Sequence, residues 1–411
     1  MFKYLKRNNK LCLTKKGNSG SIPPNRLKTY GFPRTDFMKF SVSRKEFLAT
    51  LNVASAMACK SKTIQILNCT KITINGNQMA VSSFDGDTAI VKGMSLINSD
   101  GDCSFCVNPN DLKNLLKNIA IDTIEFEYNN NVLIADYLFG QFETPTEDAD
   151  NFPTPQLGKF GENAQAIEVP SSLLIELLTL GGRYTSNDML RPILQGIYLY
   201  VKDGEFGISA TDTSKLVWKI GMNNIVGSDV NSVLSASLIP TIVESIKSEE
   251  MVTIIMSPNL IQFKNNDTKI VTRCVEGKFP NFRQVFPNDY TYEIELEKKD
   301  IIQALNLASV VGNVSKLIRF DVDMANSLLN ISARDLDTQK ASNNKIKCTF
   351  IKGDFTDFYS FGLNLSHLGV CLNAITSEKV RIKLNSPDKP VFVEDVNDVN
   401  KRTIVMPMII Q

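Results

Sequence analysis

The chain contains little of what catalysis and metal binding usually require. Its 411 residues include a single histidine, His367, and a single tryptophan. Histidine is the commonest acid–base catalyst and metal ligand, so most such schemes lack their usual residue. The sequence also has no GxxxxGK[ST] phosphate loop, no GxSxG nucleophile elbow, no HExxH zinc motif and no glycine fingerprint after a strand. These absences argue against an enzyme and leave His367, at a predicted helix start, a solvated or capping role.

Long hydrophobic runs are missing as well. No apolar stretch approaches the roughly 20 residues that span a bilayer. The opening residues MFKYLKRNNK lack the apolar part of a secretion signal. We therefore expect a cytoplasmic protein that does not bind membranes.

The eight cysteines show no framework spacing, which predicts reduced thiols. Only Cys103 and Cys106 form a CxxC pair. A structural zinc needs four ligands, and neither a second CxxC nor a nearby histidine supplies the rest. We expect no metal and no cofactor.

A net charge of +1 hides an asymmetry. Residues 1–37 hold nine Lys or Arg and one acid, Asp36, which gives them +8 and leaves −7 for the rest. Their Asn, Gly, Pro and Lys content without periodicity predicts a disordered basic arm. An upstream start before Met38 and a transit peptide are the alternatives. Because the body is acidic, any contact with nucleic acid has to come from a local basic surface.

One pattern recurs three times after the arm: an alternating strand, an amphipathic helix, then two strands around an aspartate turn. The copies begin at FSVSRKEF (40–47), IEVPSSLL (167–174) and YEIELEKK (292–299). The segments VSSFDGD, ISATDTS and ISARDLD align Asp85, Asp212 and Asp335. Such self-similarity is typical of repeated structural units.

Each copy has a second half with the same order, and its helix is predicted at 108–119, 235–248 or 364–375. The chain is therefore predicted to be α+β, with six βαβββ half-units in three domains. Proline-bearing linkers at 150–163 and 277–289 separate the copies. The predicted division is the arm over 1–37 and domains over 38–160, 161–288 and 289–411.

The pair Asp85 and Asp87 invites an alternative, since two close carboxylates can hold a metal or share a proton, as in a nuclease. The equivalent positions carry Asp212-Thr-Ser and Asp335-Leu-Asp. Because aspartate is a standard turn residue, we favour turns. Metal-dependent cleavage that is lost in Asp85→Asn would support the nuclease.

Positive charge gathers on and beside the predicted helices. Lys113 and Lys117 are four residues apart, which puts them on one helix face. The other cations of this set are Arg44, Lys45, Lys60, Lys62, Arg183, Arg191, Lys298, Lys299, Lys316 and Arg319. Most surface lysines are merely solvated. Recurrence on corresponding elements of an acidic body favours a contact surface.

Five segments, in order, resemble those of the bacterial sliding clamps, the beta subunits of DNA polymerase III. KSKTIQILN is similar to the family's R-P-T-L-P-I-L segment, RPILQGIYLY to R-x-x-L-N-G, and SATDTSKL to A-T-D-G-H-R-L. EGKFPNFRQVFP resembles D-G-R-F-P-D-Y-R-R-V-L-P, and VMPMII the terminal M-P-M-R-L. The likeness covers about residues 38–411.

The resemblance implies three tandem DNA-clamp (processivity-fold) domains, with helices lining a ring and sheets outside. It implies a non-catalytic head-to-tail homodimer that encircles double-stranded DNA without reading its sequence. A polymerase tied to such a ring gains effective concentration at the primer end. The implied partners are the replicative DNA polymerase, a clamp loader and other proteins with clamp-binding peptides. The DNA contacts would come from Lys60, Lys62, Lys113, Lys117, Arg183, Arg191 and Lys316.

The family's partner pocket lies between the second and third domains and accepts peptides with Leu or Phe anchors. Carried over by motif, its residues are Leu194, Thr211, Thr213, Ser214, Lys215, Leu216, Pro280, Gln284, Val285, Ile404, Met406, Pro407, Met408, Ile409 and Ile410. Methionines and apolar walls suit a groove that serves many peptides. Thr213-Ser214-Lys215 replaces the family's Gly-His-Arg, and Gln284 and Ile409 replace arginines. We therefore expect a less cationic pocket with its own peptide preference.

For the dimer interface, Phe142, Val310 and Val311 match positions that the family buries across subunits. Packing inside one subunit is the alternative.

A third hypothesis for the whole chain is a stand-alone scaffold or a plasmid- or phage-borne clamp variant with altered partners. Pull-down with the host polymerase's clamp-binding peptide tests this third hypothesis, since failure to bind would favour altered partners.

Overall fold

The computed structural model describes residues 37–410 apart from 59–63, 139, 154, 156, 158–159, 162, 247–250, 288, 313 and 354–358. The chain divides into Met1–Phe37 and Met38–Gln411. All described helices and strands belong to the second unit. The predicted basic arm, apart from Phe37, lies outside the described residues.

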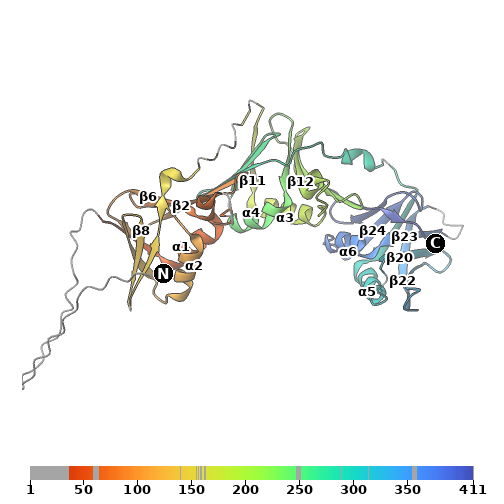
Figure 1. Ribbon diagram of the computed structural model, residues 1–411. Coiled ribbons are helices and arrows are strands. Elements are labelled where there is room, and N and C mark those ends of the chain that lie inside the picture. The colour runs from red at the N-terminus through yellow and green to blue at the C-terminus, as the bar shows by residue number, and fades with distance from the viewer. Residues whose placement is uncertain are drawn as a thin grey trace, which may run out of the picture. The chain divides into compact units, whose positions relative to one another are not determined.

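Six βαβββ half-units follow one another along the chain, as the repeat predicts (Figure 1). In the first domain they are β1 (Met38–Ser43), α1 (Arg44–Ala54), β2 (Thr70–Asn75), β3 (Gln78–Phe84) and β4 (Thr88–Ser95), then β6 (Cys103–Val107), α2 (Pro109–Asn118), β7 (Thr123–Asn129), β8 (Val132–Tyr137) and β9 (Gly140–Pro145).

The second and third domains repeat this order. The second has β11 (Gln165–Pro170), α3 (Ser171–Gly182), β12 (Gly196–Lys202), β13 (Glu205–Thr211) and β14 (Lys215–Met222), then β15 (Val230–Ser235), α4 (Ile239–Ser245), β16 (Met251–Met256), β17 (Leu260–Lys264) and β18 (Thr268–Arg273). The third has β19 (Tyr292–Glu297), α5 (Lys298–Ser309), β20 (Leu317–Asp323), β21 (Leu328–Arg334) and β22 (Ala341–Lys352), then β23 (Tyr359–Asn364), α6 (Leu365–Asn373), β24 (Lys379–Leu384), β25 (Val391–Asp395) and β26 (Lys401–Val405). Short elements are β5 (Asn98–Ser99), β10 (Glu147–Asp148), β27 (Pro407–Met408) and the 3-10 turns η1 (Gln65–Asn68), η2 (Ala149–Asn151), η3 (Pro192–Gln195), η4 (Ala236–Leu238) and η5 (Phe282–Val285).

The helices form where an apolar stripe and a cap coincide. α2 buries Leu112, Leu115 and Leu116, which share a face at helical spacing. The Asn364 side chain caps α6 by accepting from the backbone N–H of Ser366 and His367. The capping role suggested for His367 therefore belongs to Asn364.

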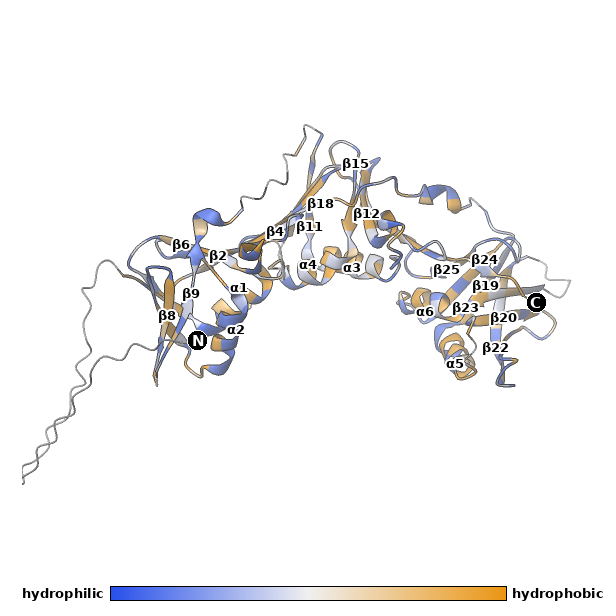
Figure 2. Ribbon diagram, viewed as in Figure 1, coloured by the Kyte–Doolittle hydropathy of each residue, from blue (hydrophilic) through white to orange (hydrophobic). Residues whose placement is uncertain are grey.

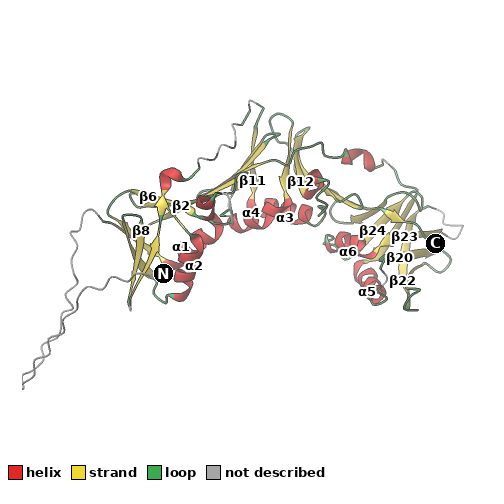
Figure 3. Cartoon of the chain, viewed as in Figure 1, coloured by secondary structure: helices red, strands yellow, loops and turns green. Residues whose placement is uncertain are grey.

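Within each domain the first strand of each half-unit pairs with the three-stranded meander of the other half-unit. Thus β1 joins β7, β8 and β9, while β6 joins β2, β3 and β4. Exchanged strands tie the two halves into a single core, in which Phe40 lies opposite Phe126 with their ring centroids 5.2 Å apart. Figure 3 shows the α-helices of each domain gathered on one side of its strands.

Two strand pairs join the domains. At the first joint β4 pairs antiparallel with β18, and at the second joint β14 pairs antiparallel with β26. The sheets therefore continue from one domain into the next. Figure 2 shows apolar and polar residues mixed along these strands, in orange and blue. At both joints one face of the sheet packs on the helices. At the second joint the other face carries Leu216, Trp218 and Ile404, which belong to a separate aromatic cluster.

The three aligned aspartates close the hairpins. Asp85 Oδ1 accepts from the backbone N–H of Asp87 and Thr88, at 3.0 and 2.7 Å. Asp212 and Asp335 accept in the same way from the residues two and three places on. The turn interpretation is confirmed, because this Asx pattern satisfies the backbone donors of a tight turn.

Candidate partner-binding and DNA-binding surfaces

At the second joint, the turn over 211–216 lies against the C-terminal strand. Lys215 is opposite Val405 and Leu216 is opposite Ile404. The Met406 N–H donates to the Ser214 carbonyl oxygen over 2.8 Å. Two segments nearly 200 residues apart, both singled out by the sequence resemblance, are therefore in direct contact.

Thr213 occupies an unusual backbone conformation in this turn. Its φ is +79°, in the left-handed region, whereas Gly86 at the equivalent place in the first domain has φ +109°. A β-branched side chain in that region is strained. The turn keeps its shape because the Thr211 hydroxyl accepts from the Thr213 N–H and donates to the Lys215 carbonyl.

The charge of Lys215 is neutralised inside the protein. Its side chain is nearly buried and its ammonium pairs with the Asp212 carboxylate, while it lies 5.9 Å from the centre of the Tyr184 ring. The nearby imidazole of His367 is half-buried rather than solvated, and burial lowers its pKa below 6.5. This edge of the site is accordingly less cationic than its sequence suggests.

An aromatic cluster covers the outer face of the second joint. The second linker contributes Phe279, Phe282 and Phe286, which pack with Leu216 and Ile404. Its Arg283 guanidinium lies 5.2 Å from the ring centres of both Tyr200 and Trp218. Such cation–π and ring contacts fix the linker onto the strands.

The remaining predicted pocket residues divide by exposure. Pro280 and Gln284 are exposed, Val285 is 39% exposed and Met406 is 40% exposed. These four provide a surface beside the buried Leu216 and Ile404. Leu194 is buried but lies outside that cluster, to which its neighbour Ile193 contributes.

The tail beyond Met406 lines a cavity of about 690 Å³. Pro407 and Met408, as β27, pair with Leu363 and Gly362 of β23, and Ile409 and Ile410 continue along the wall. Sequence reasoning missed the other wall, which includes Arg319. Alternation in LIRFDVD, with Ile318 and Phe320 in the core, would have put Arg319 on the face away from the helices.

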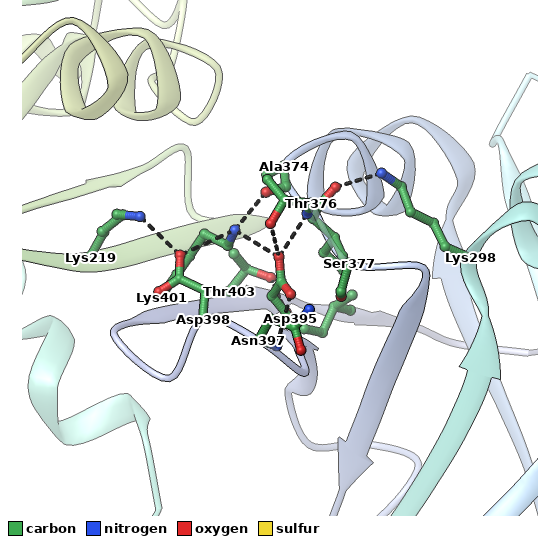
Figure 4. Close-up of polar contacts among 12 residues, drawn as sticks. Lys219, Lys298, Ala374, Thr376, Ser377, Asp395, Asn397, Asp398, Lys401 and Thr403 are labelled. Atoms are coloured by element: carbon green, nitrogen blue, oxygen red, sulfur yellow. Dashed lines mark hydrogen bonds and ion pairs between the residues drawn. The ribbon is translucent and has the colours of Figure 1, made fainter. Parts of the chain in front are cut away.

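A polar network holds the second joint on its helix side (Figure 4). The nearly buried Lys401 ammonium donates to the Ala374 carbonyl over 2.7 Å and pairs with Asp395 and Asp398. Lys219 of the second domain reaches the same Asp398 over 2.9 Å. Burial would raise the pKa of Asp395, but hydrogen bonds from Ser377 and from backbone N–H groups hold it well below its usual value. The network ties the third domain to the second.

The predicted DNA contacts are found in different settings. Lys113 and Lys117 lie on the face of α2 that points away from its buried leucines. Partial burial and repulsion by Lys117 lower the pKa of Lys113. Arg183 and Lys316 are exposed at helix and turn ends. Arg191 is exposed and pairs with Asp188 over 2.8 Å. Lys60 and Lys62 lie outside the described residues.

The predicted interface residues also differ in exposure. Val310 is 72% exposed, and Phe142 is partly buried against the core of the first domain. Val311 is 4% exposed and belongs to the core of the third domain, so it has little surface for a partner. The structure adds Leu307, which is 49% exposed on α5 and was missed from sequence.

Nothing in the described part of the chain favours metal chemistry. No group of three His, Cys, Asp or Glu side chains gathers there. Cys103 and Cys106 are three residues apart on β6 and so face opposite sides; burial raises their thiol pKa values to about 11 and about 12. Asp87 Oδ1 lies 3.2 Å from Arg273 Nη1, and neither Asp85 nor Asp87 belongs to such a group in the described residues. No described helix is long and apolar enough to cross a membrane.

Comparison with known proteins agrees with this architecture. Models of the N-terminal, central and C-terminal domains of the DNA polymerase III beta subunit match residues 38–156, 169–281 and 283–409. The beta sliding clamp of Bacillus subtilis is 21% identical over 388 residues, covering 90% of this chain and 99% of the relative. That of Pseudomonas aeruginosa is 21% identical over 374 residues, covering 90% and 100%.

Solved structures have the same fold. A P. aeruginosa sliding clamp bound to griselimycin superposes with a TM-score of 0.84 at 20% identity, covering 91% of this chain and all of that one. A B. subtilis clamp gives 0.83 at 20% identity, covering 92% and 100%.

Three tandem domains of paired βαβββ half-units, joined edge to edge into continuous sheets, define a protein of the DNA-clamp class. The chain belongs to the DNA polymerase III beta subunit family.

Proposed function

We propose that this chain is a sliding clamp: a head-to-tail homodimer that closes around duplex DNA and tethers the replicative polymerase. The observation that carries this is the pairing rule at its joints. Each joint pairs the last strand of a first half-unit, β4 or β14, with the last strand of the next domain's second half-unit, β18 or β26. Two strands of the same kind take part in neither joint: β22, which ends the first half-unit of the third domain, and β9, which ends the second half-unit of the first domain.

These two strands have edges available for a second copy. In the described residues, β9 pairs only with β8, and residues 341–347 of β22 pair only with β21. Applying the rule once more joins β22 of one copy to β9 of the next. Two copies then close into a ring of six domains in which each of these joint strands is paired. We call this expected contact the seam.

The internal joints set the expected register of the seam. In each turn the aspartate N–H donates to a backbone carbonyl three residues on, that of Thr88 or Lys215. Ile90 and Val217 lie two residues beyond these. Across the joints they face Ile270 and Thr403, and all four are almost completely buried. Each joint therefore has a fully buried residue pair on the helix side of the sheet.

At the seam, the equivalent residues are Ser342 and Phe142. We call this pair of opposite residues the rung of the seam. The large phenylalanine side chain compensates for the small serine, so the pair can fill the space between the strands and the helices. Beneath it, exposed Leu307 on α5 is the counterpart of Leu180 on α3, which is buried in the core shared by the second and third domains. Val310 extends this exposed apolar surface.

Charges on the outer face are complementary. Arg334 lies opposite Ala341 on the strand ladder, and the expected register brings Ala341 opposite Glu143 of the second copy. The small alanine lets the arginine reach the glutamate. Such a pair favours this register over others.

Sequence-independent DNA binding fits cations on mobile side chains and no base-reading motif. Lys113 and Lys117 on α2 and Lys299 on α5 extend from helices that the ring places around DNA. We propose these, with Arg183, Arg191 and Lys316, as phosphate contacts. Each would add salt dependence rather than specificity.

The partner site is proposed at Met406, Val285 and Pro280, beside Leu216 and Ile404. Its occupants would be the clamp-binding peptides of the polymerase, the loader and other proteins. We further propose a cytoplasmic location and the domain divisions 38–160, 161–288 and 289–411. No step in this function requires a catalytic residue or a cofactor.

Light scattering coupled to gel filtration tests the assembly, and loading on primed circular DNA tests the activity. A mass of twice 45.8 kDa and loader-dependent retention on circular DNA are expected. A stable monomer that never loads would overturn the proposal.

A further inference from the structure

The cavity beside the tail lies on the face of the third-domain sheet away from α5 and α6. Arg319, Gly362, Met408, Ile410 and Asp388 are among its lining residues. Among the described lining residues, the apolar ones come mainly from the tail, and the one cation comes from β20. It therefore adjoins the proposed partner site through the tail itself.

One wall depends on close approach of the tail. A Cβ on Gly362 would lie 2.6 Å from the Met408 carbonyl oxygen and 3.1 Å from Ile410 Cγ1. The absence of a side chain at Gly362 thus lets β27 sit beside β23. The pairing covers only Gly362 and Leu363. Beyond that pairing, Ile409 and Ile410 continue the tail along the cavity wall, so a peptide has to lie in the cavity rather than on the edge of β23.

The Arg319 guanidinium is oriented by two contacts. Nε donates to Asp321 Oδ1 over 2.7 Å, and Nη2 donates to Ser360 Oγ over 3.2 Å. Asp321 is almost buried, whereas the arginine side chain is 41% exposed. A fixed, partly exposed guanidinium at the end of an apolar cavity can take a second carboxylate with little further loss of side-chain freedom.

We propose that this cavity extends the partner site and takes an extended peptide whose apolar side chain packs on Met408 and Ile410 and whose Asp or Glu side chain pairs with Arg319. This inference rests on the proposed function. A doubly charged phosphate group is a poorer occupant than a single carboxylate, because Arg319 is the only cation among the described lining residues. DNA is expected on the helix side, away from this face.

The test uses short fluorescent peptides with a Leu-Phe anchor and an amidated C-terminus, which removes the terminal carboxylate. Matched Asp and Asn versions are made at successive positions around the anchor, and binding to the full-length protein is measured by anisotropy. At one position the Asp peptide should bind about threefold more tightly, the size of an exposed ion pair. Arg319→Met should abolish that preference without weakening the Asn peptide, and Arg319→Lys should keep part of it.

Lys202→Met, on a strand of the second domain, is the matched control and should leave the preference intact. Melting curves of the Arg319 variants check the fold. If peptides bind and Met406→Ala weakens them, but no position shows an Arg319-dependent Asp preference, this inference is wrong while the proposed function stands. If no peptide binds the wild-type protein, the partner site of the proposed function fails, and the inference with it.

Discussion

Replacing Thr213 by glycine should stabilise the protein. The residue has φ +79° and an exposed side chain, so the substitution relieves strain and removes no packing. A left-handed conformation costs an L-residue about 1–2 kcal/mol, and a β-branched residue is at the upper end. Glycine also destabilises the protein by about 0.5–1 kcal/mol, because it increases the conformational freedom of the unfolded chain. The net gain should be about 1 kcal/mol in the free energy of unfolding.

Urea unfolding followed by tryptophan fluorescence measures this directly. The only tryptophan, Trp218, lies on β14, which begins two residues after Thr213. Thr213→Asn should recover part of the gain, because asparagine tolerates the left-handed region better. Thr253→Gly, the same change inside β16, should instead lose about 0.5–1 kcal/mol. If Thr213→Gly is neutral or destabilising, the strain argument fails.

Three further predictions concern the seam, the histidine and the tail. Glu143→Arg should weaken dimerisation about 5–30-fold, since one pair is reversed at each of two seams, and adding Arg334→Glu should restore it in sedimentation experiments; a double variant as weak as the single one would disprove the register. Because burial depresses the pKa of His367, stability should be complete above about pH 6.5 and fall as pH decreases through that value. His367→Gln should flatten Tm between about pH 7 and pH 5.5, and an unchanged slope would rule the imidazole out. Gly362→Ala should displace the tail, which limited proteolysis of Ile410 and its neighbours should detect; equal protection in both proteins would contradict the close approach.

Local features made the half-units predictable. Alternation at Phe40 and Val42 and the spacing of Leu112, Leu115 and Leu116 depend only on neighbours in sequence. The aspartate turns are equally local, because each carboxylate bonds N–H groups two and three residues away. Recurrence at three equivalent places made these features secure.

Non-local features were not accessible in the same way. The exchange of first strands between half-units depends on pairing such as Phe40 with Phe126, which no local pattern specifies. The neutralisation of Lys215 by Asp212 depends on a side-chain geometry that sequence cannot give. Arg319 was grouped with the helix-associated cations although strand alternation would have separated it. Leu307 carries no distinguishing signal in the sequence, and its exposure in the structure singles it out.

The closed ring is the central claim, and a covalent seam tests it most directly. Phe142→Cys combined with Ser342→Cys places two thiols at the expected rung, where oxidation should join the two copies. After crosslinking in the presence of circular DNA, the account predicts protein that stays bound in high salt and is released when the DNA is cut once. Crosslinked protein that leaves intact circles as readily as linear DNA, or a failure of these two cysteines to join, would contradict it.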